Sequence, residues 1–131
     1  PVMTVEEFNV ISDVFSQAIT GELIGMSNFA SLAETIDDPH EKMEAVEHAN
    51  SERMHAEGFL AYATKHKLKI NINMHGAYWG NVRKQFLSYA NKKDFIACLV
   101  IQEVMLESFA MPTHIFTSAA MMRTRTRSTS S

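Results

Sequence analysis

The sequence is poor in several residue types, and each shortage excludes a class of protein. Its single cysteine, Cys98, permits neither an intramolecular disulfide nor a cluster of thiolate metal ligands. Five glycines and three prolines in 131 residues give few turn signals for a fold of many strands. With 46% apolar residues, the chain has ordinary globular composition and enough length for one domain. These shortages favour a helical protein.

The sequence also has no large excess of positive or negative charge and no long apolar run. The formal net charge is only −3, so no overall basic field recruits nucleic acid or acidic lipid. The longest apolar run, Phe95 to Ile101, is far shorter than the roughly 18 residues that a membrane helix needs. The first residues contain neither a basic stretch nor an apolar signal core, so a cytoplasmic location is the default expectation. We therefore expect neither nucleic acid nor membrane among the partners.

Apolar residues at three- and four-residue steps predict two long helices in the first half of the chain. Thr4 and Glu7 have the spacing of a capping box, which begins a helix over residues 5–36. Asp38 is the expected N-cap of a second helix over residues 39–66, because a proline follows it at the first helical position. Two such helices joined by a tight turn form the αα-hairpin from which helical bundles are built.

The second half of the chain predicts a connector, a shorter helix and a long last helix. Residues 67–73 form a connector that can be extended, and residues 76–90 form the shorter helix. Asn91 is the expected cap of the last helix, over residues 92–122, and Pro112 should kink or split it.

The last nine residues, RTRTRSTSS, contain no apolar residue and no periodicity. We therefore expect a disordered tail over residues 123–131, after a single helical domain over residues 1–122. The predicted fold class is all-α, an antiparallel helical bundle.

Four polar residues interrupt the apolar stripes of these helices. They are Glu22 on the first helix, Glu52 and His55 on the second, and Glu107 on the last. A buried carboxylate is costly unless it is paired or bound to a metal. In Glu-x-x-His the two side chains share a helix face, so the carboxylate can bridge two metals while the imidazole binds one. Oxygen-rich ligation with one or two histidines suits iron or manganese better than a soft-ligand metal, so the pattern predicts a metal site inside the bundle.

Other polar and sulfur-containing residues have plainer interpretations. Glu103 is either a group beside the site or a solvated residue, and His114 is expected to be a hydrogen-bonded core histidine. Cys98 should be an inert core residue, and the nine methionines should be mainly core filler. Surface positions are expected for the remaining histidines and for an acidic helix face, namely His40, His48, His66, His75, Glu41, Glu44 and Glu47.

Three segments resemble the cyanobacterial aldehyde-deformylating oxygenases. They are Gly21-Glu22, the run ERMHAEGF over residues 52–59, and the run CLVIQEVMLESFA over residues 98–110. The resemblance implies a ferritin-like bundle with a non-haem di-iron site that converts long-chain fatty aldehydes to alkanes and formate.

The resemblance also implies a role for each of the four polar residues. Glu22 corresponds to the first-helix ligand, Glu52 to the bridging carboxylate, His55 to its imidazole partner and Glu107 to the third-helix ligand. No catalytic residue beyond these metal ligands is expected.

The sequence departs from the family after Glu107. The family continues into a further ligand helix with a second Glu-x-x-His, whereas no Glu follows Glu107 here. Relative to the family, the predicted ferritin-like bundle is C-terminally truncated. Its site then holds one metal or none unless another chain provides the missing ligands, and we expect a homo-oligomer.

With a complete site, the resemblance implies a fatty aldehyde as substrate and an external electron donor, because the sequence has no flavin or nicotinamide motif. Three alternatives stay open. The chain is a non-catalytic, oligomerising ferritin-like module, another ferritin-like oxidase or hydroxylase, or a metal-storage protein.

Overall fold

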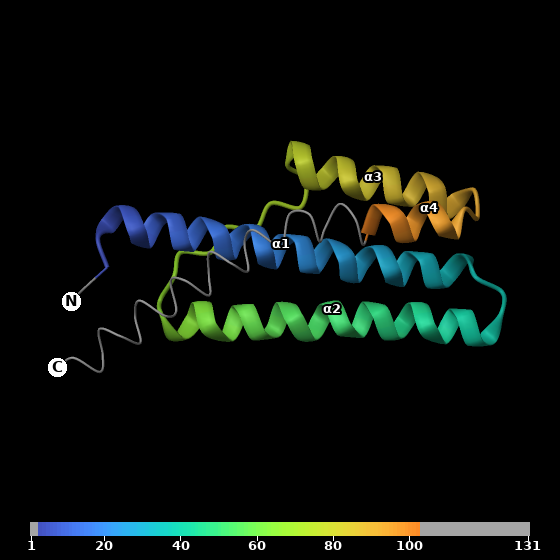
Figure 1. Ribbon diagram of the computed structural model, residues 1–131, viewed down its shortest axis with the longest axis horizontal. Coiled ribbons are helices and arrows are strands. Elements are labelled where there is room, and N and C mark those ends of the chain that lie inside the picture. The colour runs from blue at the N-terminus through green and yellow to red at the C-terminus, as the bar shows by residue number, and fades with distance from the viewer. Residues whose placement is uncertain (1–2, 103–131) are drawn as a thin grey trace.

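The computed structural model describes residues 3–102, and all regular elements in that range are helices. They are α1 (Val5–Thr35), α2 (Pro39–Lys65), α3 (Ala77–Asn91) and α4 (Phe95–Val100), each antiparallel to the one before it (Figure 1). The predicted all-α helical bundle is thus confirmed. None of these helices combines the length and apolarity that crossing a bilayer requires.

Local side-chain caps begin the two long helices as the sequence predicts. The Glu7 backbone N–H donates to Thr4 Oγ1 at 3.1 Å, and the Thr4 N–H donates to Glu7 Oε2 at 3.1 Å. Asp38 Oδ2 accepts from the Glu41 N–H at 2.9 Å, and Pro39 is the first residue of α2. Both helices end within one residue of their expected ends, so the αα-hairpin is confirmed.

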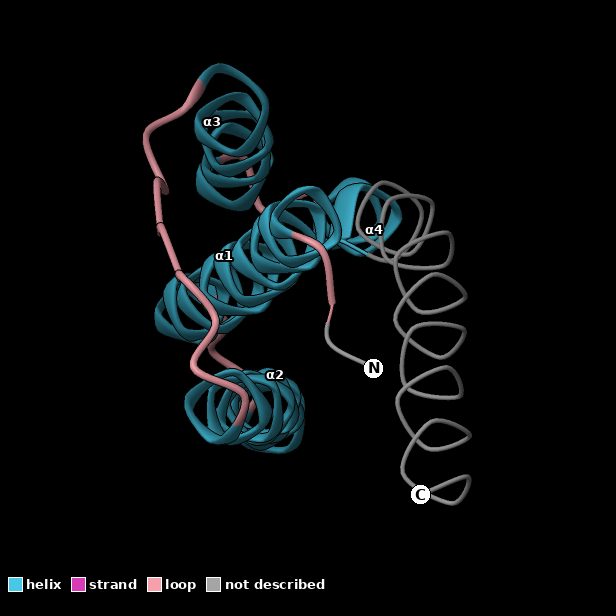
Figure 2. Ribbon diagram, turned by 90° about the vertical axis from the view of Figure 1, so that its left-hand side faces the viewer, coloured by secondary structure: helices cyan, strands magenta, loops and turns pink. Residues whose placement is uncertain are grey.

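Helix α1 lies at the centre of the bundle, between α2 and α3, with α4 beside it (Figures 1 and 2). The side of α2 that meets α1 is formed by small buried residues, Ala45, Ala49, Ala56 and Ala63. The core includes Phe29 of α1, Phe86 of α3 and Cys98 of α4. Small residues let the two long helices approach closely, which brings polar side chains on both within reach of each other.

The connector between α2 and α3 runs along α1 (Figure 2). Its backbone N–H groups at Lys69 and Asn71 donate to the hydroxyls of Ser12 and Ser16, at 3.0 and 2.9 Å. Ser16 in turn donates to the carbonyl of Ser12 at 2.7 Å. Two buried serines of α1 thus satisfy backbone donors of a segment that has no regular structure of its own.

The predicted boundary between the last two helices is wrong in one respect. Asn91 is not a cap but the last residue of α3. Lys93 has a φ of 57°, which ends the helix, and Asp94 caps α4 by accepting from the Ala97 N–H at 3.1 Å. The remainder of the predicted last helix, Pro112 and the tail over 123–131 lie outside the described residues.

Several minor predictions can also be tested. Cys98 is fully buried, and burial raises its pKa to about 11, so it is the inert thiol that was expected. Met43 and Met54 of α2 are exposed, so these two lie outside the core that was expected for most of the methionines. His48 is exposed as predicted, yet its ring stacks on Phe29 with centroids 4.9 Å apart.

Candidate metal centre

Three of the four predicted ligands meet between α1 and α2. One ligand atom each of Glu22, Glu52 and His55 lies within 4.8 Å of the others, a grouping that could hold a metal ion. His55 Nδ1 lies 3.4 Å from Glu22 Oε2. Glu22 comes from the middle of α1, and the other two come from one turn of α2, as the i, i+3 spacing predicts.

Gly25, one turn after Glu22, makes room for the carboxylate of Glu52. A Cβ at Gly25 would stand 3.2 Å from Glu52 Cδ and 3.3 Å from Glu52 Cγ. The same Cβ would lie 2.6 Å from the side-chain nitrogen of Gln102. A side chain at position 25 would therefore displace the ends of the Glu52 and Gln102 side chains where α1 passes them.

Both carboxyl groups of the cluster are costly to ionise in the absence of a cation. Burial raises the pKa of Glu22, an effect that its interaction with Glu52 partly offsets. Burial, followed by the nearby Glu22, raises the pKa of Glu52 to about 8, although His55 and His48 act in the opposite direction. The raised pKa therefore favours the protonated form of Glu52 unless a positive charge binds.

The shielded carboxylate of Glu22 supports the fit of a cation. Glu22 Oε2 is shielded from water, His55 Nδ1 lies 3.4 Å from it, and a protonated Glu52 is a hydrogen-bond donor to the same carboxylate. Buried carboxylate oxygens need such partners, and a metal ion that replaces the proton is another way to satisfy them. Two carboxylates and one imidazole are a donor set that suits iron or manganese.

His55 differs from the sequence-based expectation in its exposure. Its side chain is 57% exposed, whereas that of Glu22 is 14% exposed. The apolar stripe of α2 is centred on residues such as Ala56, and adjacent residues on a helix are turned by about 100°. His55 therefore lies at the edge of the stripe, not within it, and forms the rim of the cluster.

Sequence reasoning missed the role of two buried amides beside the cluster. Asn28 of α1 and Gln102, just beyond α4, are 0% and 2% exposed. Asn28 Nδ2 donates to Gln102 Oε1 at 3.2 Å. Asn28 lies one turn after Gly25 on the stripe that carries Glu22, and this spacing is the signal that could have identified it.

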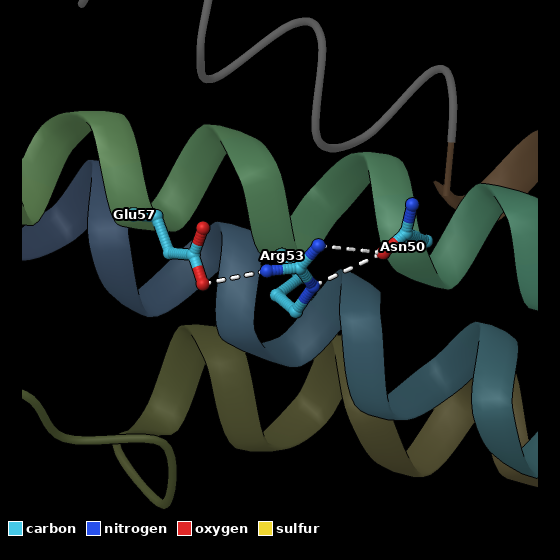
Figure 3. A network of polar contacts seen from close by, with 3 residues as sticks. All are labelled: Asn50, Arg53 and Glu57. Atoms are coloured by element: carbon cyan, nitrogen blue, oxygen red, sulfur yellow. Dashed lines mark hydrogen bonds and ion pairs between the residues drawn. The ribbon is translucent and has the colours of Figure 1, made fainter.

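A second polar group on α2 serves as a comparison for the cluster. Figure 3 shows Arg53 between Asn50 and Glu57, with its Nη1 2.6 Å from Glu57 Oε1. Arg53 Nε and Nη2 both donate to Asn50 Oδ1, at 3.0 and 2.9 Å. All three residues are exposed and the carboxylate is paired, so Glu57 shows none of the features that distinguish Glu52.

Glu107, the fourth predicted ligand, lies outside the described residues, as do Glu103 and His114. Its role as a ligand stays a prediction.

Comparison with known proteins shows the family of the chain. A sequence model of the long-chain fatty aldehyde decarbonylase family matches residues 7–127, which include all four predicted ligands. No solved structure matches the chain. Because the match extends over almost the whole sequence, the chain belongs to the long-chain fatty aldehyde decarbonylase family.

Proposed function

We propose that this chain binds iron through Glu22, Glu52, His55 and Glu107 and converts long-chain fatty aldehydes to alkanes and formate. The observation that carries the proposal is the cluster of Glu22, Glu52 and His55, in which one ligand atom of each residue lies within 4.8 Å of the others. Membership of the aldehyde decarbonylase family supports the reaction class. Manganese is the alternative metal, because the same donors suit it.

The residues of the cluster have distinct tasks in this proposal. Glu52 would hold the metal together with its neighbours Glu22 and His55, and it would release the proton that its raised pKa favours. His55 at the rim would provide an imidazole ligand from the more open side. When bound, iron supplies the redox chemistry that reduces O₂.

The balance of atoms fixes what else the reaction consumes. One aldehyde RCHO, one O₂, four electrons and four protons become one alkane RH, one formic acid and one water. The carbon–carbon bond to the aldehyde carbon breaks, and that carbon leaves as formic acid. O₂ accepts the electrons, which an external donor must supply.

The first test measures iron per chain on protein purified without chelator from iron-supplemented cells. Glu52→Gln should abolish iron binding while leaving helicity unchanged, because the amide keeps the shape of the side chain but cannot provide a negative charge. Glu57→Gln is the matched control on the same helix and should bind iron as the wild type does. Equal iron in both variants would contradict the site.

The second test measures products. Iron-loaded protein, given a fatty aldehyde, O₂ and a chemical reductant, should release alkane and formate in equal amounts. Iron binding without either product would favour metal storage over the proposed reaction.

An oligomeric form is a further part of the proposal. Large apolar side chains are exposed along α2, among them Met43, Val46 and Met54. We propose that a second copy covers this surface, since exposed apolar patches of this kind mark contact sites. Analytical ultracentrifugation should show a dimer or larger species that Val46→Glu reduces to a monomer, and a monomeric wild type would contradict the proposal.

A further inference from the structure

The charges of this chain are strongly segregated along its sequence. Residues 58–93 contain seven Lys or Arg and no Asp or Glu, whereas residues 1–57 contain twelve Asp or Glu and two Lys or Arg. The first range includes the end of α2, the connector and α3. A nearly neutral net charge thus hides a basic stretch of the sequence over residues 58–93.

Three of these cations lie close together in sequence where α2 passes into the connector. Lys65, Lys67 and Lys69 are all exposed, and none forms an ion pair with any residue in the described range 3–102. The connector is held in place, because the backbone N–H groups of Lys69 and Asn71 donate to serines of α1. The cations are therefore presented on a fixed backbone.

An aromatic pair at the start of α3 follows the connector and packs against α1 directly before Glu22. Tyr78 is 46% exposed, and its ring meets that of the buried Trp79 edge-on, with centroids 4.9 Å apart. Trp79 Nε1 donates to Gln17 Oε1 at 2.8 Å. A Cβ at Gly21 would lie 2.7 Å from Cη2 of Trp79, so the indole covers the residue directly before Glu22.

These contacts follow one another along helix α1. The connector is bound at Ser12 and Ser16, Trp79 at Gln17 and Gly21, and Glu22 follows. At a rise of 1.5 Å per residue, Ser12 and Glu22 are about 15 Å apart along the helix. The cationic connector and the aromatic pair therefore accompany one short stretch of α1 that ends at the metal centre.

We infer that Lys65, Lys67, Lys69 and Tyr78, which we call the connector face, form the docking surface for an acidic one-electron carrier protein. The inference rests on the proposed function, which takes four electrons from outside the chain. Each encounter oxidises the carrier by one electron and reduces the metal centre by one, so one aldehyde requires four encounters. Tyr78 and Trp79 gain and lose no electron. They lie between the docked carrier and Glu22, in the space that the electron crosses.

The test measures binding to the full 131-residue chain. The probe is an acidic [2Fe–2S] carrier protein without tryptophan, so that quenching of Trp79, the single tryptophan of the chain, reports docking. Lys67→Glu/Lys69→Glu should weaken binding at low ionic strength by about tenfold or more, because like charges then face each other. Added salt should weaken binding to the wild type as well.

The matched control changes the charge by the same amount elsewhere in the basic stretch. Lys92→Glu/Lys93→Glu alters the turn between α3 and α4, where Lys93 lies 3.4 Å from Asp37. This variant should bind the carrier within twofold of the wild type. Equal weakening by both double variants would overturn the assignment to the connector face. So would wild-type binding to phosphatidylglycerol vesicles but not to the carrier, since the partner is then a membrane.

Carrier binding requires neither aldehyde nor product, so its failure is distinguishable from failure of the proposed function. Selective loss of binding in Lys67→Glu/Lys69→Glu, in a protein that forms no alkane, would support the docking surface and contradict the reaction. Alkane formation with a chemical reductant, in a protein whose connector variants bind the carrier as the wild type does, would contradict the docking surface alone.

Discussion

Asn28 and Gln102 are 74 positions apart in the sequence, yet their buried side-chain amides form a hydrogen bond of 3.2 Å beside the metal centre. The nitrogen of Gln102 also lies close to Gly25, which in turn faces the carboxylate of Glu52. The remaining amide atoms, Asn28 Oδ1 and Gln102 Nε2, have no partner within residues 3–102. This pair therefore ties the residues after α4 to the part of α1 that carries the cluster.

A double-mutant cycle on this pair should show coupling. Asn28→Ala and Gln102→Ala each leave a buried amide without its partner, whereas the double variant removes both groups. We expect a coupling free energy on the order of 1 kcal/mol, measured by chemical denaturation. Additive effects of the two substitutions would show that the hydrogen bond contributes nothing to stability.

Gly25→Ala should destabilise the fold and impair the metal centre together. The new methyl group would lie 2.6 Å from Gln102 Nε2 and 3.2 Å from Glu52 Cδ, and both side chains would have to move. Overpacking of this kind costs about 1–3 kcal/mol of unfolding free energy. Displacement of Glu52 should also lower the iron bound per chain.

Gly58→Ala is the control for that substitution and should have the opposite sign. Gly58 is an exposed residue within α2, and a Cβ there would meet no atom within 4 Å. Alanine is favoured over glycine in a helix by roughly 0.5–1 kcal/mol, so the variant should be more stable than the wild type. Destabilisation by both variants would mean that the contacts at Gly25 are not the cause.

The caps and the Glu-x-x-His pair could be predicted because they depend on neighbours in the sequence. Thr4 and Glu7 bond across three residues, and Glu52 and His55 share a turn, so helix geometry alone brings each pair together. The meeting of Glu22 with this pair required only that the two helices form a hairpin. These features follow from local spacing and one tight turn.

The surroundings of the site could not be predicted in the same way. The bond between Asn28 and Gln102 joins distant segments, and no local pattern selects that pairing. The exposure of His55 depends on how α2 is rotated against α1, and the apolar stripe defines that rotation only to within about one residue step. The contact of Trp79 with Gly21 likewise depends on the packing of α3.

Ser16→Ala should loosen the connector. The Ser16 hydroxyl accepts from the Asn71 N–H and donates to the Ser12 carbonyl, so alanine leaves a backbone donor without a partner. We expect a loss of about 1–3 kcal/mol in unfolding free energy and faster amide exchange at Asn71. The control, Ser51→Ala at an exposed position of α2, should change stability by less than about 0.5 kcal/mol. Unchanged exchange at Asn71 would contradict the role of Ser16.

The raised pKa of Glu52 predicts that the metal-free protein becomes less stable as the pH rises. The pKa is about 8 in the folded protein, and its ordinary value of 4.5 applies to the unfolded chain. Between these values the folded state retains a proton that the unfolded state has lost, so the free energy of unfolding falls with pH and levels off above about 8. Contact with water keeps the slope well below the roughly 1.4 kcal/mol per pH unit of one fully coupled proton.

Urea denaturation in the presence of a chelator, at about pH 5, 6.5 and 8, measures this slope. Glu52→Gln should reduce the slope to the part that the raised pKa of Glu22 contributes, and it should exceed the wild type in stability at about pH 8, because the amide cannot ionise in its buried setting. Glu57→Gln, whose carboxylate is exposed and paired with Arg53, should retain the wild-type slope. Addition of iron to the wild type should reverse the trend, since the cation favours the ionised form of Glu52 and releases its proton. Identical slopes in the wild type and Glu52→Gln would show that Glu52 does not hold a proton at neutral pH, and the cluster would then lack the strain that a metal relieves.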